Sequence, residues 1–239
     1  MRTLTRMTDR AIATDDDSPL RASFSAVIFD MDGVIVDSEP RHIRAFMDVF
    51  REMGYEHNHG IEFEAYLGKS DESVWIDFVD MHKPEKTLPE LQEWKQSHLI
   101  NILKEEEPIF PGLPQLVDRL AARVPLAVAS GSLHPVIDAV LEIGNLRRHF
   151  QHVVSVQDVG KTKPAPDIFL RTAELLRIPP AEICVIEDSA AGVEAALAAG
   201  MQVIAITNSL TRDKLGRATC VVDSYEEIGQ LLLPETVSA

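Results

Sequence analysis

The sequence predicts an α/β protein in which a doubly wound parallel sheet forms the core and an inserted bundle of helices forms a cap. Three observations predict this fold. Short apolar runs rich in β-branched residues recur along the chain, and segments with helical spacing lie between several of them. Strands that alternate with helices favour a parallel sheet covered on both faces. A long interval without such runs follows the first strand, which indicates the insertion.

The expected core strands are short and continuously apolar, as strands buried on both faces of a parallel sheet are. Helical spacing lies between them, for example from Leu113 to Leu120 and from Val193 to Gly200. We therefore expect a Rossmann-like core. The runs are Ala26 to Phe29, Val124 to Ala129, Val153 to Val156, Ile183 to Ile186, Val203 to Ile206 and Cys220 to Val222.

The interval at 39–110 is expected to be a helical cap domain, because its apolar residues follow helical spacing and no strand run interrupts them. Gly54 can end its first helix. The core then comprises 24–38 and 111–239, and 1–23 is expected to be a disordered tail. The apolar stripes of the cap are Phe46, Val49, Phe50 and Met53, then Leu91, Trp94, His98 and Ile102.

Composition limits the partners. Lys and Arg number 23 against 38 Asp and Glu, so the formal net charge at pH 7 is −15. That charge repels nucleic acids and anionic membranes, and no apolar run approaches the roughly 20 residues of a membrane span. Cys184 and Cys220 lie in apolar runs without metal-like spacing, which favours reduced core residues in a cytoplasmic protein. We expect a monomer or a weak homodimer.

Ligands of such sheets bind at the carboxyl ends of the strands. After the first expected strand come Asp30, Asp32 and Gly33. One carboxylate can attack phosphorus while its neighbour acts as general acid and base, and the glycine permits a sharp turn. A solvated turn explains this triplet equally well on its own. A calcium loop does not, because Gly33 falls too early in the pattern.

The second expected strand is followed by Ser130 and Gly131, where a hydroxyl and free backbone N–H groups can hold phosphate oxygens. An ordinary serine N-cap is the alternative.

Lys163 lies in a proline-rich loop after the third expected strand. The preceding Gly-Lys-Thr resembles the end of a P-loop, but Ser155 stands where the earlier glycine should be, and Pro164 prevents a helix from following directly. We therefore interpret Lys163 as a cation that neutralises a phosphoryl group and a neighbouring carboxylate. A surface lysine is the alternative.

The fourth strand end carries Glu187 and Asp188, again before a helix-period segment. Paired carboxylates suit Mg²⁺, which takes hard oxygen ligands. An acidic N-cap is the alternative. Taken together, the strand ends supply a nucleophile, a hydroxyl, a cation and metal-binding acids, which is the set that phosphoryl transfer requires.

The segments FDMDGVIVDSE, VASGS, KPAPDIF and VIEDSAAGVEAA resemble the four motifs of the haloacid dehalogenase superfamily. The helical insertion resembles the small cap of its branch with beta-phosphoglucomutase, phosphoglycolate phosphatase and sugar-phosphate phosphatases. The resemblance implies that Asp30 is the nucleophile and Asp32 the general acid and base. It also implies phosphate contacts from Ser130 and Lys163, and a Mg²⁺ site made by Asp30, the Asp32 carbonyl and Asp188, with Glu187 joining or supporting it.

Further candidate substrate-binding positions are Gly33, Gly131, His42 at the cap hinge, where similar mutases and phosphatases place a histidine, and the cap residues Lys69 and Lys95. A packed hinge residue is the alternative for His42, and solvated lysines are the alternative for Lys69 and Lys95. Similar mutases carry an arginine in the first cap loop, whereas the loop from Leu67 to Ser73 has none and places acids after Lys69. We therefore expect a phosphatase that acts on a small phosphorylated metabolite, with a sugar-phosphate mutase as the alternative.

Other classes fit less well. True dehalogenases lack the second aspartate and need no Mg²⁺, so Asp32 counts against that activity. A phosphorylatable receiver domain is shorter and has no helical cap. A non-catalytic binding protein would be expected to have lost at least one of Asp30, Asp32, Lys163 and Asp188, and all are present.

Overall fold

The computed structural model describes residues 24–66 and 70–233. Its core is a six-stranded parallel sheet in the order β3-β2-β1-β4-β5-β6, which confirms the expected doubly wound α/β fold. The predicted tail at 1–23 and Lys69 lie outside the described residues. The strands are β1 (Ala26–Phe29), β2 (Leu126–Ser130), β3 (Phe150–Ser155), β4 (Ile183–Glu187), β5 (Gln202–Ile206) and β6 (Cys220–Val222).

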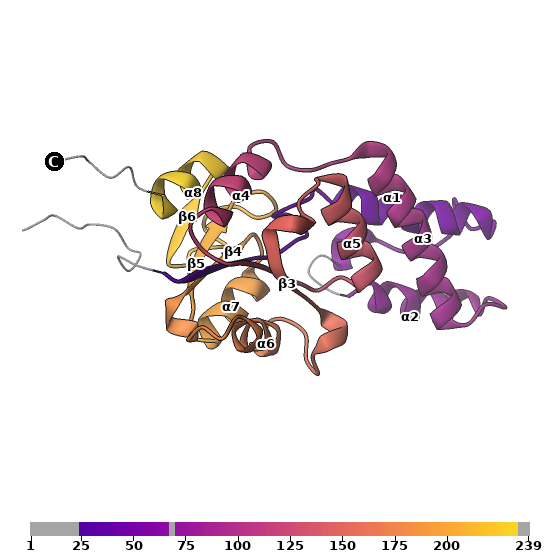
Figure 1. The fold of residues 1–239 in the computed structure, drawn as a ribbon. Helices are drawn as coiled ribbons and strands as arrows, with labels where there is room; N and C mark the ends of the chain where they lie inside the picture. The colour runs from indigo at the N-terminus through magenta and orange to yellow at the C-terminus, as the bar shows by residue number, and fades with distance from the viewer. Residues whose placement is uncertain (1–23, 67–69, 234–239) are drawn as a thin grey trace, which may run out of the picture.

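Helices cover both faces of this sheet (Figure 1), and that explains the continuous apolar strands. Every residue of β1 is buried, because alternate side chains enter the two apolar clusters on opposite faces. Val27 and Phe29 pack with α4 (Leu113–Ala121), α5 (His134–Ile143) and α8 (Tyr225–Leu232). Ala26 and Ile28 pack with α6 (Asp167–Leu176) and α7 (Ala190–Ala198).

The second and third strands differ most from their expected bounds. The second strand begins at Leu126 rather than Val124, since Pro125 precedes it and lacks the N–H that a ladder requires. The third begins earlier, at Phe150, and ends at Ser155. Its first residues include two polar side chains, Gln151 and His152, so a search for apolar runs does not detect where the strand begins. Neither difference moves a strand end away from the expected site.

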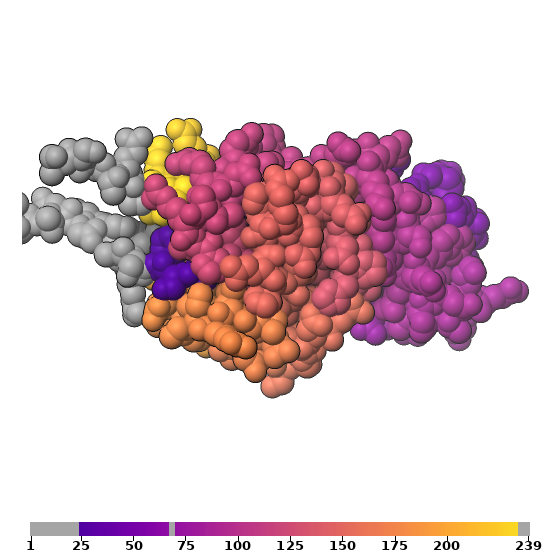
Figure 2. All heavy atoms as spheres, viewed as in Figure 1, coloured from indigo at the N-terminus to yellow at the C-terminus, as the bar shows by residue number. Residues whose placement is uncertain are grey.

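The interval after β1 holds helices α1 (Glu39–Glu52), α2 (Asp71–His82) and α3 (Leu88–Glu106). They share a third apolar cluster, separate from the two that cover the sheet, with Phe46, Trp75 and Phe78 among its members. Figure 1 shows these helices together at one end of the molecule. In Figure 2 the surface of α3 adjoins that of α5, a helix of the core that it contacts. We propose on this basis that 39–110 forms the cap.

The buried face of α3 differs from the expected stripe. Leu91 and Ile102 are buried, but Trp94 and His98 are only half-buried, and Lys95 lies between them with 2% of its surface exposed. The helix therefore turns a charged residue inward, which an apolar pattern cannot anticipate. Among the described residues, no helix combines the length and the apolar character that a membrane crossing requires.

Candidate active site

The ends of β1, β2 and β4 lie side by side, because these three strands are neighbours in the sheet. Asp30 follows β1 directly, Ser130 ends β2 and Glu187 ends β4. All three are almost completely buried, at 6%, 0% and 0% exposed. The parallel order thus brings side chains that are far apart in sequence to one edge of the sheet.

Lys163 joins them from the loop between β3 and α6. Its Nζ donates to Oδ1 of Asp30 at 2.5 Å, to Oε1 of Glu187 at 2.7 Å and to the Ala129 carbonyl at 3.3 Å. Burial alone lowers the pKa of Lys163, but the two carboxylates outweigh it and raise the pKa above its usual value. Lys163 is therefore a fixed cation beside Asp30.

Glu187 holds two parts of the site together. Its Oε1 accepts from Lys163, and its Oε2 accepts from the backbone N–H groups of Asp188 and Ser189, both at 2.9 Å. The hydroxyl of Ser189 also donates to Oε2 and accepts from the N–H of Gly192, in the first turn of α7. An added Cβ on Gly192 would lie 1.7 Å from Glu187 Oε1, so only glycine allows this approach. Both oxygens of Glu187 are committed to protein donors.

Asp188 lies opposite the loop that follows β1. Oδ2 of Asp188 accepts a short hydrogen bond from the Ser209 hydroxyl, and Asn208 Nδ2 donates to the Gly33 carbonyl at 2.7 Å. The segment after β5 therefore fixes both the Asp188 carboxylate and the β1 loop. Gly33 has a φ of +76°, a left-handed conformation that favours glycine.

The acids form a cluster that suits a divalent cation. Oxygen atoms of Asp30, Glu187 and Asp188 all lie within 4.8 Å of one another. Burial raises the pKa of Asp188 to about 7, helped by the Glu187 charge. Burial also raises the pKa of Asp30 well above its usual value, although Lys163 opposes this. One ammonium does not balance these carboxylates, so the hard oxygen donors present fit Mg²⁺.

Asp32 is held in a different set of contacts. Its Oδ1 accepts from the Ser38 hydroxyl at 2.6 Å, and its Oδ2 accepts from the hydroxyls of Ser132 at 2.8 Å and Ser130 at 3.3 Å. Burial favours the neutral acid, but hydrogen bonds from His42, Ser38 and Ser132 outweigh it and lower the pKa of Asp32 to about 2. In this arrangement Asp32 is an ionised, oriented carboxylate.

Ser130 and Gly131 occupy the expected strand end but differ in their surroundings. The Ser130 hydroxyl is buried and accepts from the Ser132 N–H at 3.0 Å. Gly131 is exposed, and an added Cβ would meet nothing within 4 Å. Ser132 and Ser209 were missed by the sequence analysis. Both lie in the loops that follow strands, Ser132 after β2 and Ser209 after β5, so inspection of every hydroxyl in these loops would have found them.

Helices α1 and α3 contribute His42 and Lys95 to the same region. His42 Nε2 lies 3.7 Å from Oδ1 of Asp32, and its Nδ1 lies 2.6 Å from Lys95 Nζ. Burial and the Lys95 charge lower the pKa of His42, but hydrogen bonds to Asp32 and Asp71 outweigh them and raise it. Asp71, a residue that the sequence analysis did not single out, accepts from Lys95 at 2.5 Å.

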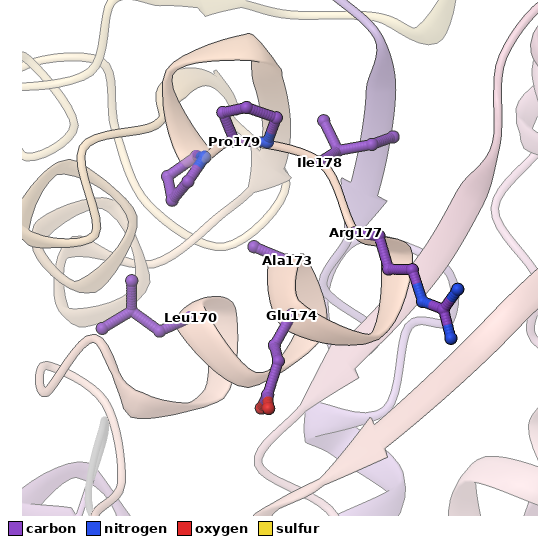
Figure 3. Close-up of a pocket in the computed structure, with 7 residues that line it drawn as sticks. Leu170, Ala173, Glu174, Arg177, Ile178 and Pro179 are labelled. Atoms are coloured by element: carbon purple, nitrogen blue, oxygen red, sulfur yellow. The ribbon is translucent and has the colours of Figure 1, made fainter.

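One further pocket lies elsewhere, against α6 (Figure 3). Leu170, Ala173 and Glu174 of the helix line it together with the turn at 177–180. That turn precedes β4, so the pocket lies toward the amino ends of the strands, opposite the acids. It contains none of the residues that the sequence singled out.

Comparison with known proteins identifies the family of this chain. A family model described as haloacid dehalogenase-like hydrolase matches residues 27–206. Fructose-1-phosphate phosphatase YqaB from Escherichia coli strain K12 is 30% identical over 184 residues, which cover 76% of this chain and 95% of that protein. The chloroplastic protein SUPPRESSOR OF QUENCHING 1 from Arabidopsis thaliana is 37% identical over 205 residues, which cover 84% of this chain and 19% of that protein.

A solved structure shares the architecture. The crystal structure of a CbbY mutant from Rhodobacter sphaeroides in complex with xylulose-1,5-bisphosphate has a TM-score of 0.76 and 25% sequence identity, and the match covers 86% of this chain and 96% of that chain. The family match spans all four strand ends, from Asp30 to the pair Glu187 and Asp188. The chain therefore belongs to the haloacid dehalogenase-like hydrolase family.

Proposed function

We propose that this protein is a Mg²⁺-dependent phosphatase that hydrolyses a small phosphorylated metabolite of the sugar-phosphate kind through an aspartyl-phosphate on Asp30. The observation that carries the proposal is the contact between Asp30 and Lys163, 2.5 Å apart at the edge of the sheet and beside two further buried acids. The similarity to a fructose-1-phosphate phosphatase supports the substrate class.

The proposed reaction has two steps. An oxygen of Asp30 attacks phosphorus, the bond from phosphorus to the ester oxygen breaks, and Asp32 gives a proton to the departing alcohol. In the second step Asp32 takes a proton from water, the water oxygen attacks phosphorus, and the bond from Asp30 to phosphorus breaks to release phosphate. The lowered pKa keeps Asp32 ionised before the ester binds. In the proposed mechanism Asp32 therefore takes up a proton when the ester binds, gives it to the departing alcohol and regains one from water.

The remaining residues hold and balance charge. Lys163 places its ammonium next to Asp30, where it would also meet a phosphoryl oxygen, and Ser130 presents a buried hydroxyl at the same edge. Asp30, Asp188 and the Asp32 carbonyl are the proposed ligands of Mg²⁺, and Glu187 supports them by holding Lys163. When bound, Mg²⁺ would offset the repulsion between these carboxylates and the phosphate.

A mutase would pass the phosphoryl group from Asp30 to a second sugar phosphate instead of water. It has to hold a second phosphate in the cap, for which arginine is the suitable side chain. The loop at 67–73 contains no arginine, and the buried Lys95 is already paired with Asp71. These features favour hydrolysis.

The direct test is a hydrolysis screen with Mg²⁺ over phosphorylated sugars, sugar alcohols, glycerol, glycolate and nucleotides. We expect phosphate release from one or a few monophosphates, and no release when Mg²⁺ is chelated. A second assay uses beta-glucose 1-phosphate with catalytic glucose 1,6-bisphosphate. Formation of glucose 6-phosphate much faster than phosphate release would assign the protein as a mutase, and no turnover of any ester would rule out both.

A further inference from the structure

We infer that Asp71 is a specificity-determining residue of the cap: its carboxylate accepts hydrogen bonds from hydroxyl groups of a neutral, polyhydroxylated leaving group and disfavours leaving groups that carry a carboxylate or a second phosphate. The inference rests on the proposed phosphatase function and narrows its substrate class to monophosphate esters of sugars and sugar alcohols. It depends on how the cap fixes Asp71 and on where Asp71 lies relative to Asp32.

One side of Asp71 is fixed by the cap. It is the first residue of α2, and its Oδ2 accepts from Lys95 at 2.5 Å while its Oδ1 lies 3.5 Å from His42 Nδ1. Yet 45% of the Asp71 side chain remains exposed, against 3% for that of Lys95. The carboxylate is therefore held at a defined place with free acceptor positions, because each carboxylate oxygen can accept more than one hydrogen bond.

Asp71 faces the same space as the general acid and base. His42 lies between the two carboxylates, 3.7 Å from Asp32 and 3.5 Å from Asp71. The side chains of Asp32, His42 and Asp71 are 31%, 20% and 45% exposed, so all three line an accessible surface between core and cap. Asp32 has to lie beside the ester oxygen to protonate it, so the leaving group attached to that oxygen extends toward His42 and Asp71.

The charges on this surface oppose an anionic leaving group. Lys95 is buried, lies 4.8 Å from the centre of the Phe46 ring and is neutralised by Asp71, so it offers no free cation. Arg41 and Arg44, the described arginines near the start of α1, are paired with Glu106. A carboxylate or phosphate placed beside Asp71 would meet a like charge, whereas a hydroxyl would donate to it.

The test compares substrates within one enzyme. We would measure kcat/KM with fructose 1-phosphate and sorbitol 6-phosphate as neutral-leaving-group substrates, and with phosphoglycolate and fructose 1,6-bisphosphate as anionic ones. In Asp71→Asn we expect the preference for the neutral group to fall by about tenfold or more, mainly through KM, because the amide removes the negative charge. Asp80→Asn, an exposed acid of the same helix, is the matched control.

In Asp71→Asn alone, Lys95 loses its carboxylate partner, and this could disturb the cap. A second variant controls for that effect. In Asp71→Asn combined with Lys95→Met, neither charge of the pair remains, and the same loss of preference is expected. An equal loss of kcat/KM with every substrate would show that Asp71 only supports the cap. An unchanged preference for neutral leaving groups in both variants would also overturn the inference. A wild-type enzyme that hydrolyses no phosphate ester would instead remove the proposed function itself, which separates the two failures.

Discussion

An ideal Cβ on Gly33 would lie 1.8 Å from Oδ2 of Asp188, well inside any permitted contact. The Asp188 carboxylate therefore packs directly against the backbone of the loop after β1. Gly33 adopts a left-handed φ of +76° at this contact. The two residues are distant in sequence, and only adjacent strands bring them together. This contact fixes the spacing of the proposed Mg²⁺ ligands.

Gly33→Ala should therefore separate the β1 loop from Asp188 and weaken Mg²⁺ binding. We expect the Mg²⁺ concentration for half-maximal activity to rise by about tenfold or more, together with a backbone strain of about 1–3 kcal/mol in the free energy of unfolding. Mg²⁺ titration of activity and urea denaturation measure the two effects. Gly160→Ala is the control, since Gly160 is exposed and has nothing within 4 Å of an added Cβ. Equal Mg²⁺ dependence in both variants would contradict the close contact.

Asp30→Asn should abolish phosphate release while leaving the protein folded. The amide is a poor nucleophile of nearly the same shape, and Lys163 keeps its bonds to Glu187 and the Ala129 carbonyl. Phosphate release and circular dichroism measure activity and fold. Asp37→Asn, seven positions further on and paired with Arg41 at the surface, should retain activity. More than a trace of turnover in Asp30→Asn would refute the aspartyl-phosphate.

Lys163→Met should destabilise the protein and not merely inactivate it. Removing the ammonium leaves Asp30 and Glu187 buried without their counter-ion, and breaking such a pair typically costs about 3–5 kcal/mol. Urea denaturation measures the change in free energy of unfolding. Lys161→Met removes an exposed charge from the same loop and should change it little. The same small effect in both variants would mean that Lys163 is a surface lysine after all.

Mg²⁺ should stabilise the protein more at high pH than at low pH. The pKa of Asp188 is raised to about 7 from an ordinary value of 3.8, so the folded protein binds more protons than the unfolded chain between those values. This contribution to stability is complete below the unfolded pKa and is lost as the pH rises through about 7. Above that pH the carboxylate is free to bind Mg²⁺.

Thermal unfolding with and without Mg²⁺, at about pH 5.5 and about pH 8.5, measures this dependence. The increase in Tm should be larger at the higher pH. In Asp188→Asn, which cannot ionise, the difference between the two conditions should shrink. A Mg²⁺ effect that is equal at both pH values in the wild-type protein would show that Asp188 does not compete with protons for the metal.

Much of the core follows from the sequence alone. The predicted apolar runs, Ala26 to Phe29 and Ile183 to Ile186, are buried on both faces, so hydrophobicity and length suffice to identify them as inner strands. Parallel strands end at one edge of the sheet, and this is why Asp30, Lys163 and Glu187 were predicted to share one site. The sequence determines the inner strands and the position of the site, because the strands follow from local hydrophobicity and the site follows from the rule that ligands bind at the carboxyl ends of parallel strands.

Other features depend on contacts between segments that no local pattern connects. Lys95 is charged and lies on a helix, so its burial against Asp71 and His42 follows only from the way α1, α2 and α3 pack. The hydroxyl of Ser209 reaches Asp188 because β5 lies next to β4. Tertiary structure decided these pairings, since burial of a charge is favourable only where folding supplies its partner, and the sequence does not state which partner that is.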